Sequence, residues 1–219
     1  MISIDEKAKT YLNENKQLFF ESYTSGIKPR EEKVAYLTAG MSGVGKTEFA
    51  IYLKEQIDNL LHLDTDEIRK FYEPVGYDGQ NSDLFQSAAS RGFNKLFDYA
   101  LKKGYSLILD TNLSSVGQAK ANIERLLKRE YNIHIFYFYH YPEKCFEYAT
   151  EREVVTHRRV PKDVFIKSNE NSYKTILEIK SLYGEKVTLH FIDRRDDSYH
   201  TDIDEGYLQE KIGENFETR

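Results

Sequence analysis

Apolar and polar residues alternate along the chain with two different periods, which predict a repeated strand and helix order. Five short runs are almost continuously apolar, as the buried strands of a parallel sheet are. These runs are residues 33–39, 60–64, 105–109, 133–139 and 187–192. Between them, apolar residues recur every three or four positions, the spacing of one helix face. These helical stretches are residues 3–23, 48–57, 82–103, 115–130, 142–152 and 161–182.

Residues 40–47 interrupt the pattern between the first apolar run and the helix after it. Their sequence, Gly-Met-Ser-Gly-Val-Gly-Lys-Thr, matches G-x-x-x-x-G-K-[ST] at every fixed position. Glycines permit backbone conformations closed to other residues, so the amides of such a loop converge on an anion at a helix N-terminus. A glycine turn before a helix is the alternative, but it does not account for both flanks. The residues expected to bind ATP are Gly40, Met41, Ser42, Gly43, Val44, Gly45, Lys46 and Thr47.

Within this loop two side chains have separate expected tasks. Lys46 reaches the β- and γ-phosphates, and the Thr47 hydroxyl holds Mg²⁺. The loop and the alternation together predict an α/β fold, a P-loop NTPase-type three-layer sandwich with a mostly parallel five-stranded sheet and helices on both faces. This domain spans residues 33–192 and includes a helical lid at about 143–165. Residues 1–32 are predicted as an N-terminal helix and connector, and residues 193–219 as an acidic tail, partly ordered at best.

Four of the predicted strands end at a glycine or a polar side chain. These ends are Gly40, Asp64, Asp110 and His140. In open α/β sheets ligands bind beyond the carboxyl ends of the strands, which lie at one edge. We therefore expect these positions to meet at one binding rim.

Composition and charge narrow the class of protein. With 219 residues, 31% charged and 40% hydrophobic, the chain has the profile of a soluble domain. The net charge of −5 comes from residues 193–219, which hold nine acidic and four basic residues. Such a chain lacks the basic footprint of a general nucleic-acid binder, so nucleic acid is not the expected partner. Because Cys145 is the only cysteine and no stretch has the length of a membrane span or a signal core, we expect a cytoplasmic protein without a membrane partner.

Asp66 and Arg69 are candidate catalytic and substrate-binding residues. Asp66 lies two residues past the strand end Asp64, and Arg69 is three further on, on the same face of a helical turn. Beside a phosphate loop, Asp66 is placed to orient a substrate hydroxyl and accept its proton. A carboxylate is a weak base, but phosphoryl transfer depends mostly on positioning and charge neutralisation. The alternative is a helix cap with a surface ion pair.

Asp110 ends the apolar run Ser-Leu-Ile-Leu-Asp and is followed by Thr111 and Asn112. An acid in this position is the expected second contact to Mg²⁺, often through water. Two alternatives remain: Asp110 faces the acceptor substrate, or Asp110 and Asn112 cap the next loop.

Arg152 and Arg158 flank the junction of two predicted helices in a charged segment. A planar guanidinium bridges phosphate oxygens and offsets charge in the transition state, and such a segment suits a lid that closes over the nucleotide. The alternative is a solvated charge cluster. By contrast, His62, His134 and His140 lack the spacing of metal ligands and are predicted as core or rim residues.

Together these motifs resemble the zeta-toxin family of P-loop kinases. The likeness covers about residues 33–180 and includes the phosphate loop, Asp64-x-Asp66, residues 77–81 with the long helix after them, residues 110–112 and the lid at 152–161. It implies an ATP-dependent kinase that phosphorylates a sugar hydroxyl of UDP-N-acetylglucosamine, the toxin of a bacterial toxin–antitoxin system. An antitoxin protein is the partner that the resemblance implies.

The resemblance also implies a role for each candidate residue. Residues 46–47 hold nucleotide and Mg²⁺, Asp66 is the catalytic base, and Arg152 and Arg158 contact the phosphates. Residues 110–112 line the sugar site, although an acidic residue followed by Gly-Thr is common there in the family. The nucleotide sugar, or another small hydroxyl acceptor, is thus the expected substrate.

Three other classes stay open from the sequence. The Asp66-Glu-Ile-Arg69 step also resembles polynucleotide 5′-hydroxyl kinases, which require a basic channel for the acceptor. A nucleotide-dependent switch such as a GTPase is disfavoured, because the nearest approach to Asn-Lys-x-Asp, residues 94–98, has one residue too many. A regulatory protein that has kept the fold and lost activity is disfavoured by the intact Lys46, Thr47 and Asp66.

Overall fold

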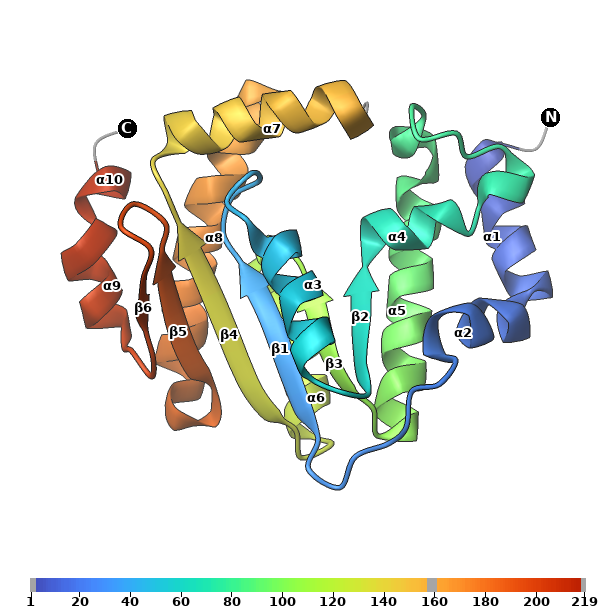
Figure 1. The fold of residues 1–219 in the computed structure, drawn as a ribbon, viewed down its shortest axis with the longest axis horizontal. Coiled ribbons are helices and arrows are strands. Elements are labelled where there is room, and N and C mark those ends of the chain that lie inside the picture. The colour runs from blue at the N-terminus through green and yellow to red at the C-terminus, as the bar shows by residue number, and fades with distance from the viewer. Residues whose placement is uncertain (1–2, 157–160, 218–219) are drawn as a thin grey trace.

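The computed structural model describes residues 3–156 and 161–217. At its centre lies a six-stranded sheet with the order β2-β3-β1-β4-β5-β6 (Figure 1). Strands β1 to β5 pair in parallel, and β6 pairs antiparallel with β5. The strands are β1 (Val34–Ala39), β2 (Leu60–Asp64), β3 (Ser106–Asp110), β4 (Asn132–Tyr139), β5 (Thr188–Asp193) and β6 (Ser198–His200). The predicted α/β class and its five parallel strands are confirmed, whereas β6 was not expected.

One face of the sheet is covered by α3 (Lys46–Gln56), the helix that follows the phosphate loop. It crosses in front of the sheet in Figure 1. Ala50 packs with Leu60 and Ile108 in a small apolar cluster on this side. The helix ends near Ile57, as the apolar spacing predicts, and the chain then turns back into the sheet at the edge strand β2.

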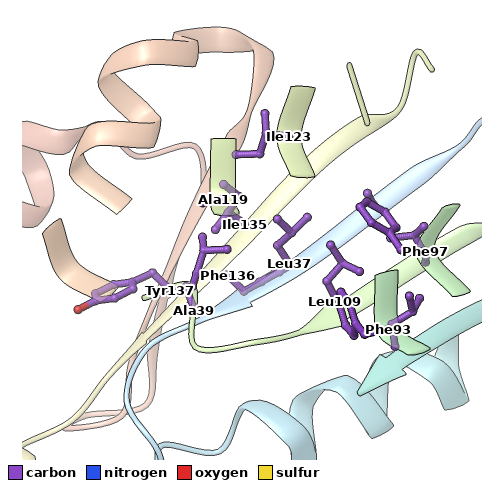
Figure 2. Close-up of a cluster of buried hydrophobic side chains, with 14 of the residues drawn as sticks. Leu37, Ala39, Phe93, Phe97, Leu109, Ala119, Ile123, Ile135, Phe136 and Tyr137 are labelled. Carbon is purple, nitrogen blue, oxygen red and sulfur yellow. The ribbon is translucent and has the colours of Figure 1, made fainter. Parts of the chain in front are cut away.

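The opposite face holds the main hydrophobic core. The helices there are α5 (Gln86–Lys103), α6 (Val116–Leu127) and α8 (Lys162–Tyr183). Figure 2 shows Leu37 and Leu109 of the sheet in one buried cluster with Phe93, Phe97 and Ile123 of these helices. Because successive strand residues point to opposite faces, every second residue of β1 and β3 enters this core.

The N-terminal segment forms two helices where the sequence predicts one over residues 3–23. α1 (Ile4–Glu14) and α2 (Lys16–Thr24) meet at Asn15, whose backbone leaves the helical region at φ −108° and ψ 29°. The Asn15 side-chain amide donates to the carbonyl of Tyr11 (3.0 Å). A local side-chain bond of this kind competes with the helix and explains the break. α1 packs on α5 and supports it from outside.

Short elements connect β2 to α5. α4 (Thr65–Lys70) begins directly after the strand, and two 3₁₀ turns follow at Glu73–Val75 and Ser82–Phe85. Ser82, where the apolar spacing predicts the long helix to begin, lies in the second of these turns, and the α-helix itself begins at Gln86.

α7 (Pro142–Thr156) is the first helix of the predicted lid and extends past its expected end. In Figure 1 it runs across the carboxyl ends of the central strands. A third 3₁₀ turn, Gly184–Lys186, joins α8 to β5. Among the helices within residues 3–156 and 161–217, none combines the length and apolar character that crossing a bilayer requires.

The structure corrects the expectation of a partly ordered acidic tail. After β6 come α9 (Glu205–Ile212) and α10 (Glu214–Glu217), in which Leu208 and Ile212 are fully buried. The Phe216 ring stacks on Tyr173 of α8 at a centroid distance of 4.1 Å. These apolar residues are too sparse to show a helical period among so many charges. Their burial depends on α8 and β5, which a local pattern does not reveal.

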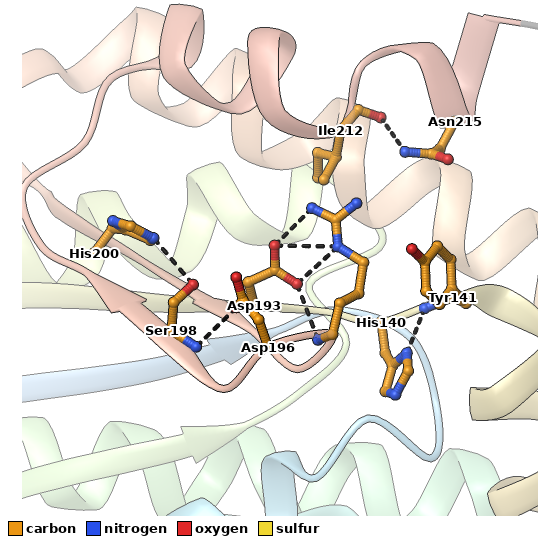
Figure 3. Close-up of polar contacts among 9 residues, drawn as sticks. His140, Tyr141, Asp193, Asp196, Ser198, His200, Ile212 and Asn215 are labelled. Atoms are coloured by element: carbon orange, nitrogen blue, oxygen red, sulfur yellow. Dashed lines mark hydrogen bonds and ion pairs between the residues drawn. The ribbon is translucent and has the colours of Figure 1, made fainter.

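The turn between β5 and β6 is held by charge pairing. The guanidinium of Arg195 donates to both carboxylate oxygens of Asp193 (2.8 and 2.6 Å), a bidentate contact drawn in Figure 3. The same guanidinium lies 4.9 Å from the ring centroid of Tyr139 on β4. The charged residues that led to the prediction of an acidic tail therefore hold this segment against the sheet.

Candidate active site

A cavity of about 1180 Å³ opens at the carboxyl ends of the parallel strands, the rim predicted from the sequence. Its walls include residues 42–47 of the phosphate loop, while Gly40 and Met41 are buried behind them. The other predicted residues that line it are Asp66, Arg69, Asp110, Thr111, Asn112 and Arg152. Predicted residues from four separate segments of the chain thus share one space.

The phosphate loop is held closely from two sides, and glycine is needed at both contacts. Gly40 has φ 125°, and a Cβ there would lie 2.4 Å from the carbonyl oxygen of Phe138 on β4. Gly43 has φ 78°, and its Cβ would lie 2.3 Å from the carbonyl oxygen of Cys145 on α7. Neither space admits a side chain, so the loop packs directly on the backbone of the neighbouring strand and of the lid helix.

Lys46 is 7% exposed and donates to the carbonyl of Met41 in its own loop (2.6 Å). Burial lowers the pKa of its ammonium group to about 8, although the charge of Asp110 opposes that shift. Arg152 adds to the lowering, which reflects a nearby positive charge on α7. A mostly protonated lysine in a site of positive potential suits an anion such as a triphosphate.

Asp110 is fixed at the end of β3 by Thr38 of β1. The Thr38 hydroxyl donates to Asp110 Oδ1 (3.1 Å) and accepts from the backbone N–H of Thr111 (3.0 Å). Burial opposes ionisation of Asp110, but the His62 ring, the Thr47 hydroxyl and the Lys46 ammonium lower its pKa. An ionised carboxylate beside a hydroxyl forms an oxygen donor set, which is what Mg²⁺ prefers. The residues present therefore fit the ion that the sequence predicts.

Asp64 and Asp66 lie together at the start of α4. Asp64 Oδ1 accepts from the backbone N–H of Asp66 (2.8 Å) and so caps the helix. Burial, together with the charges of Asp66 and Asp110, raises the pKa of Asp64 to about 6. The cap that was one alternative for Asp66 thus belongs to Asp64, and the Asp66 carboxylate points elsewhere.

The ion pair between Arg69 and Asp66 that was the alternative does form, but Arg69 is 2% exposed, so its guanidinium lies inside the protein while the Asp66 side chain stays 40% exposed. Its guanidinium contacts Asp66 Oδ1 with one nitrogen and the amide oxygen of Gln86 with another. A buried, two-sided contact restricts both partners. Arg69 therefore orients the Asp66 carboxylate at the edge of the cavity, and Gln86 is a contributor that the sequence analysis missed.

The lid helix contributes Tyr148, Glu151 and Arg152 to the cavity wall. Arg152 is where the sequence predicts it, beside the phosphate loop. Arg158 lies outside the described residues, and its predicted contact with the phosphates stays a prediction.

Ser172 is a further residue that sequence analysis missed. Its Oγ accepts from the backbone N–H of Gly40 (2.9 Å) and donates to the carbonyl of Asn112 (2.6 Å). One buried hydroxyl on α8 thus joins the start of the phosphate loop to the end of β3. No local pattern marks it, because it lies within a long helix far along the chain.

The cavity extends to both sides of the phosphate loop, because β1 lies between β3 and β4 in the sheet. On the β3 side its wall consists mainly of neutral groups from α5 and α6, which are Gln86, Ser90, Phe93, Asn94, Gln118 and Asn122. On the β4 side the wall is aromatic and charged, with Phe49, Tyr52, Phe138, Tyr148, Arg194 and Asp197. Arg194 and Asp197 come from the β5–β6 turn that was expected to be a tail, so their place here was not predicted.

The sequence model of the family described as Zeta toxin matches residues 20–204. The chain belongs to the zeta toxin family. This membership covers the phosphate loop, both carboxylate segments and α7, and it reaches past β6. A search among proteins of curated function found no match.

Solved structures share the fold of this zeta toxin chain. A chain from the PezAT chromosomal toxin–antitoxin system of Streptococcus pneumoniae is 19% identical with a TM-score of 0.78, over 95% of this chain and 90% of that one. A chain of the AvrRxo1-ORF1:-ORF2 complex with ATP is 14% identical with a TM-score of 0.65, over 95% and 71%. A chain of the Pnkp1/Rnl/Hen1 RNA repair complex is 17% identical with a TM-score of 0.56, over 68% and 47%. At these identities the likeness shows the fold alone.

Family and fold together support a P-loop, kinase-like toxin with phosphotransferase chemistry. The family expected from the sequence is confirmed.

Proposed function

We propose that this protein is a kinase that transfers the γ-phosphoryl group of ATP to a sugar hydroxyl of UDP-N-acetylglucosamine. The observation that carries the proposal is the convergence of Lys46, Asp66 and Arg152 on one cavity beside the phosphate loop. Family membership and an ATP-containing structural neighbour support nucleotide binding at that loop.

The proposed reaction is a direct displacement at the γ-phosphorus. The acceptor oxygen forms a bond to phosphorus as the bond to the bridging oxygen breaks, ADP leaves, and the hydroxyl proton passes to Asp66. Lys46 and Arg152 offset the negative charge on the transferring group. Thr47 and Asp110 would hold Mg²⁺, which supplies further neutralisation of the phosphates. Arg69 acts through Asp66, because it fixes the direction of that carboxylate.

The neutral wall between α5 and α6 supports a sugar as the acceptor. Amide and hydroxyl groups of Gln86, Ser90, Asn94 and Asn122 face this side of the cavity. Such groups donate and accept hydrogen bonds with hydroxyl and acetamido groups. The aromatic wall on the β4 side, with Phe49 and Tyr148, suits a nucleobase.

A polynucleotide 5′-hydroxyl kinase is the second candidate. The Asp66-Glu-Ile-Arg69 step resembles this class, and a chain from an RNA repair complex shares the fold. A polynucleotide acceptor would need cations along its path, and its binding would weaken steeply with salt. The amide-rich wall favours the sugar.

The partner we propose is an antitoxin protein, in keeping with the toxin–antitoxin neighbour and the family. The proposed site of action is the cytoplasm, where ATP and nucleotide sugars are available.

The test is phosphoryl transfer from labelled ATP to a panel of UDP-sugars, free sugars and 5′-hydroxyl oligonucleotides, with products identified by mass. We expect one added phosphate on UDP-N-acetylglucosamine. Asp66→Asn should keep ATP affinity and lower transfer by about 10²–10⁴-fold, because the proton acceptor is lost. Lys46→Ala should lose ATP affinity as well.

Asp58→Asn, an exposed change just before β2 and at the opposite end of that strand from the cavity, is the matched control and should match the parent. Transfer by Asp66→Asn at the parent rate would remove Asp66 from the mechanism. A product found only with oligonucleotides would replace the sugar by a polynucleotide.

A further inference from the structure

Three side chains that can bind metal ions meet on the α3 side of the sheet. His62 and Asp64 lie two residues apart on β2, so they share a face, and Asp64 pairs in register with Asp110 of β3. One ligand atom from each of the three lies within 4.8 Å of the others. His62 was predicted as a core or rim residue because its spacing in the sequence is not that of a metal ligand.

Two atoms of this cluster are buried and have no hydrogen-bond partner. They are His62 Nε2 and Asp110 Oδ2, on side chains that are 10% and 6% exposed. They face each other at 3.6 Å, which is longer than a hydrogen bond. A neutral imidazole nitrogen and a carboxylate oxygen both present lone pairs, so their approach favours a cation between them.

Hydrogen bonds to their Oδ1 atoms orient the carboxylates of Asp110 and Asp64. Asp110 Oδ1 accepts from the Thr38 hydroxyl at 3.1 Å, and Asp64 Oδ1 accepts from the Asp66 backbone N–H at 2.8 Å. In both hydrogen bonds the acceptor is the Oδ1 atom of the carboxylate, so neither bond involves Oδ2. The cluster is therefore oriented by groups that belong to neighbouring elements, as ligands of a metal usually are.

The distance of 3.6 Å between His62 Nε2 and Asp110 Oδ2 fits two ligands of one metal ion. Nitrogen and oxygen ligands about 2.0–2.2 Å from a tetrahedral Zn²⁺ are roughly 3.4 Å apart. A shared proton would draw the same atoms to a distance of about 2.7–3.2 Å. One imidazole with two carboxylates is a donor set that suits transition metals, whereas Mg²⁺ takes oxygen ligands.

We propose that His62, Asp64 and Asp110 bind a divalent transition-metal ion of the Mn²⁺ or Zn²⁺ class, without nucleotide. This site differs from the proposed Mg²⁺ position at Thr47, which depends on the nucleotide phosphates. Asp110 borders both. Metal binding at this site requires neither an acceptor substrate nor phosphoryl transfer.

Mn²⁺ is the probe, because its unpaired electrons report on its ligands. The full chain without nucleotide is titrated with Mn²⁺ and free ion is measured by electron paramagnetic resonance. We expect one bound Mn²⁺ per chain, and a pulsed spectrum with coupling to a directly bound ¹⁴N nucleus. His62→Gln should abolish the ¹⁴N coupling and weaken binding at least about tenfold. Thr47→Val should keep the ¹⁴N coupling and most of the Mn²⁺ affinity, since Thr47 is not one of the three proposed ligands, although its hydroxyl contacts Asp110.

His134→Gln is the matched histidine control, because His134 lies on β4 away from the cluster, and it should behave as the parent. Three results would overturn the proposal: no stoichiometric binding without nucleotide, unchanged ¹⁴N coupling in His62→Gln, or loss of binding in Thr47→Val. If His62→Gln does not fold, absence of ¹⁴N coupling in the parent still decides against it. ATP affinity in Mg²⁺, measured on the same samples, tests the phosphate-loop assignment separately.

Discussion

The two faces of the central sheet come from the same strands, yet they carry different side chains. On β2, Leu61 and Leu63 enter the main core under α5, while His62 and Asp64 point to the α3 side. On β3 the same alternation puts Leu109 in the core and Asp110 beside the cavity. The period of two along a strand thus assigns alternate residues to stability and to chemistry.

The face on which a polar residue lies explains its presence in an apolar strand. A parallel sheet covered on both faces is expected to be apolar throughout. In β4 and β5, Ile135 and Phe191 follow this rule in the main core, whereas His134 and His190 occupy the α3 side. These two histidines lie on one face, the face that also borders the phosphate loop.

The division between the two faces is tested most directly by changing neighbouring residues of β3 that point to opposite faces. Leu109→Ala should lower the free energy of unfolding by about 2–5 kcal/mol, because it opens a cavity in the fully buried core. Asp110→Asn should change unfolding less, since Thr38 still donates to the oxygen that remains, and should lose ion-dependent ATP turnover. Urea denaturation and a turnover assay measure the two effects.

The reverse result, an unaffected Leu109→Ala with an unfolded Asp110→Asn, would show that the faces are not divided in this way.

A second prediction uses acid to test the histidines of the α3 side. His190 Nδ1 lies 2.8 Å from the Tyr199 hydroxyl and its Nε2 lies 3.0 Å from His134 Nδ1. Burial, with the nearby His134, lowers the His190 pKa from 6.5 to about 4. Between these values the unfolded chain binds more protons than the folded one, so acid favours unfolding. Stability should fall by about 1–3 kcal/mol between pH 7 and pH 4.5.

Urea denaturation of the parent and of His190→Gln at both pH values isolates this contribution. Glutamine keeps a hydrogen-bonding amide and does not titrate, so its stability should fall less. An equal fall in both proteins would mean that other groups cause the acid sensitivity.

The smallest expected effect concerns Lys46, at the start of the helix that covers the polar face. Its pKa of about 8 means that the ammonium loses its proton just above neutral pH. A triphosphate needs the charged form, so ATP affinity should fall as pH rises above 8, by up to about tenfold per pH unit. Calorimetric titration with ATP from pH 7 to 9.5 measures it.

Arg152→Gln is the informative variant, because Arg152 contributes to the lowered pKa of Lys46. The fall in affinity should then occur at higher pH. If the ATP affinity of the parent stayed constant from pH 7 to 9, Lys46 would not be a buried group that loses its proton in this range.

Much of the fold followed from local patterns. The five parallel strands were found because each is a continuous apolar run, and α6 begins after Ser115 as expected. The break at Asn15 was missed because the apolar spacing of residues 3–23 continues through it. β6 was missed because its three residues form no apolar run and Tyr199 is exposed, and α9 was missed because its few buried residues, Leu208 and Ile212, are covered by α8.

The phosphate loop could be predicted from local sequence alone, since residues 40–47 are adjacent in the chain and their backbone geometry is a local property. The sequence also predicted that Asp66 and Asp110 lie at one rim, because parallel strands end at the same edge. The contacts of Ser172 with this loop and with the segment after β3, and the approach of His62 to Asp110, follow from the tertiary structure. The first depends on which helix crosses the strands and the second on which strands are neighbours in the sheet, and neither is set by sequence spacing.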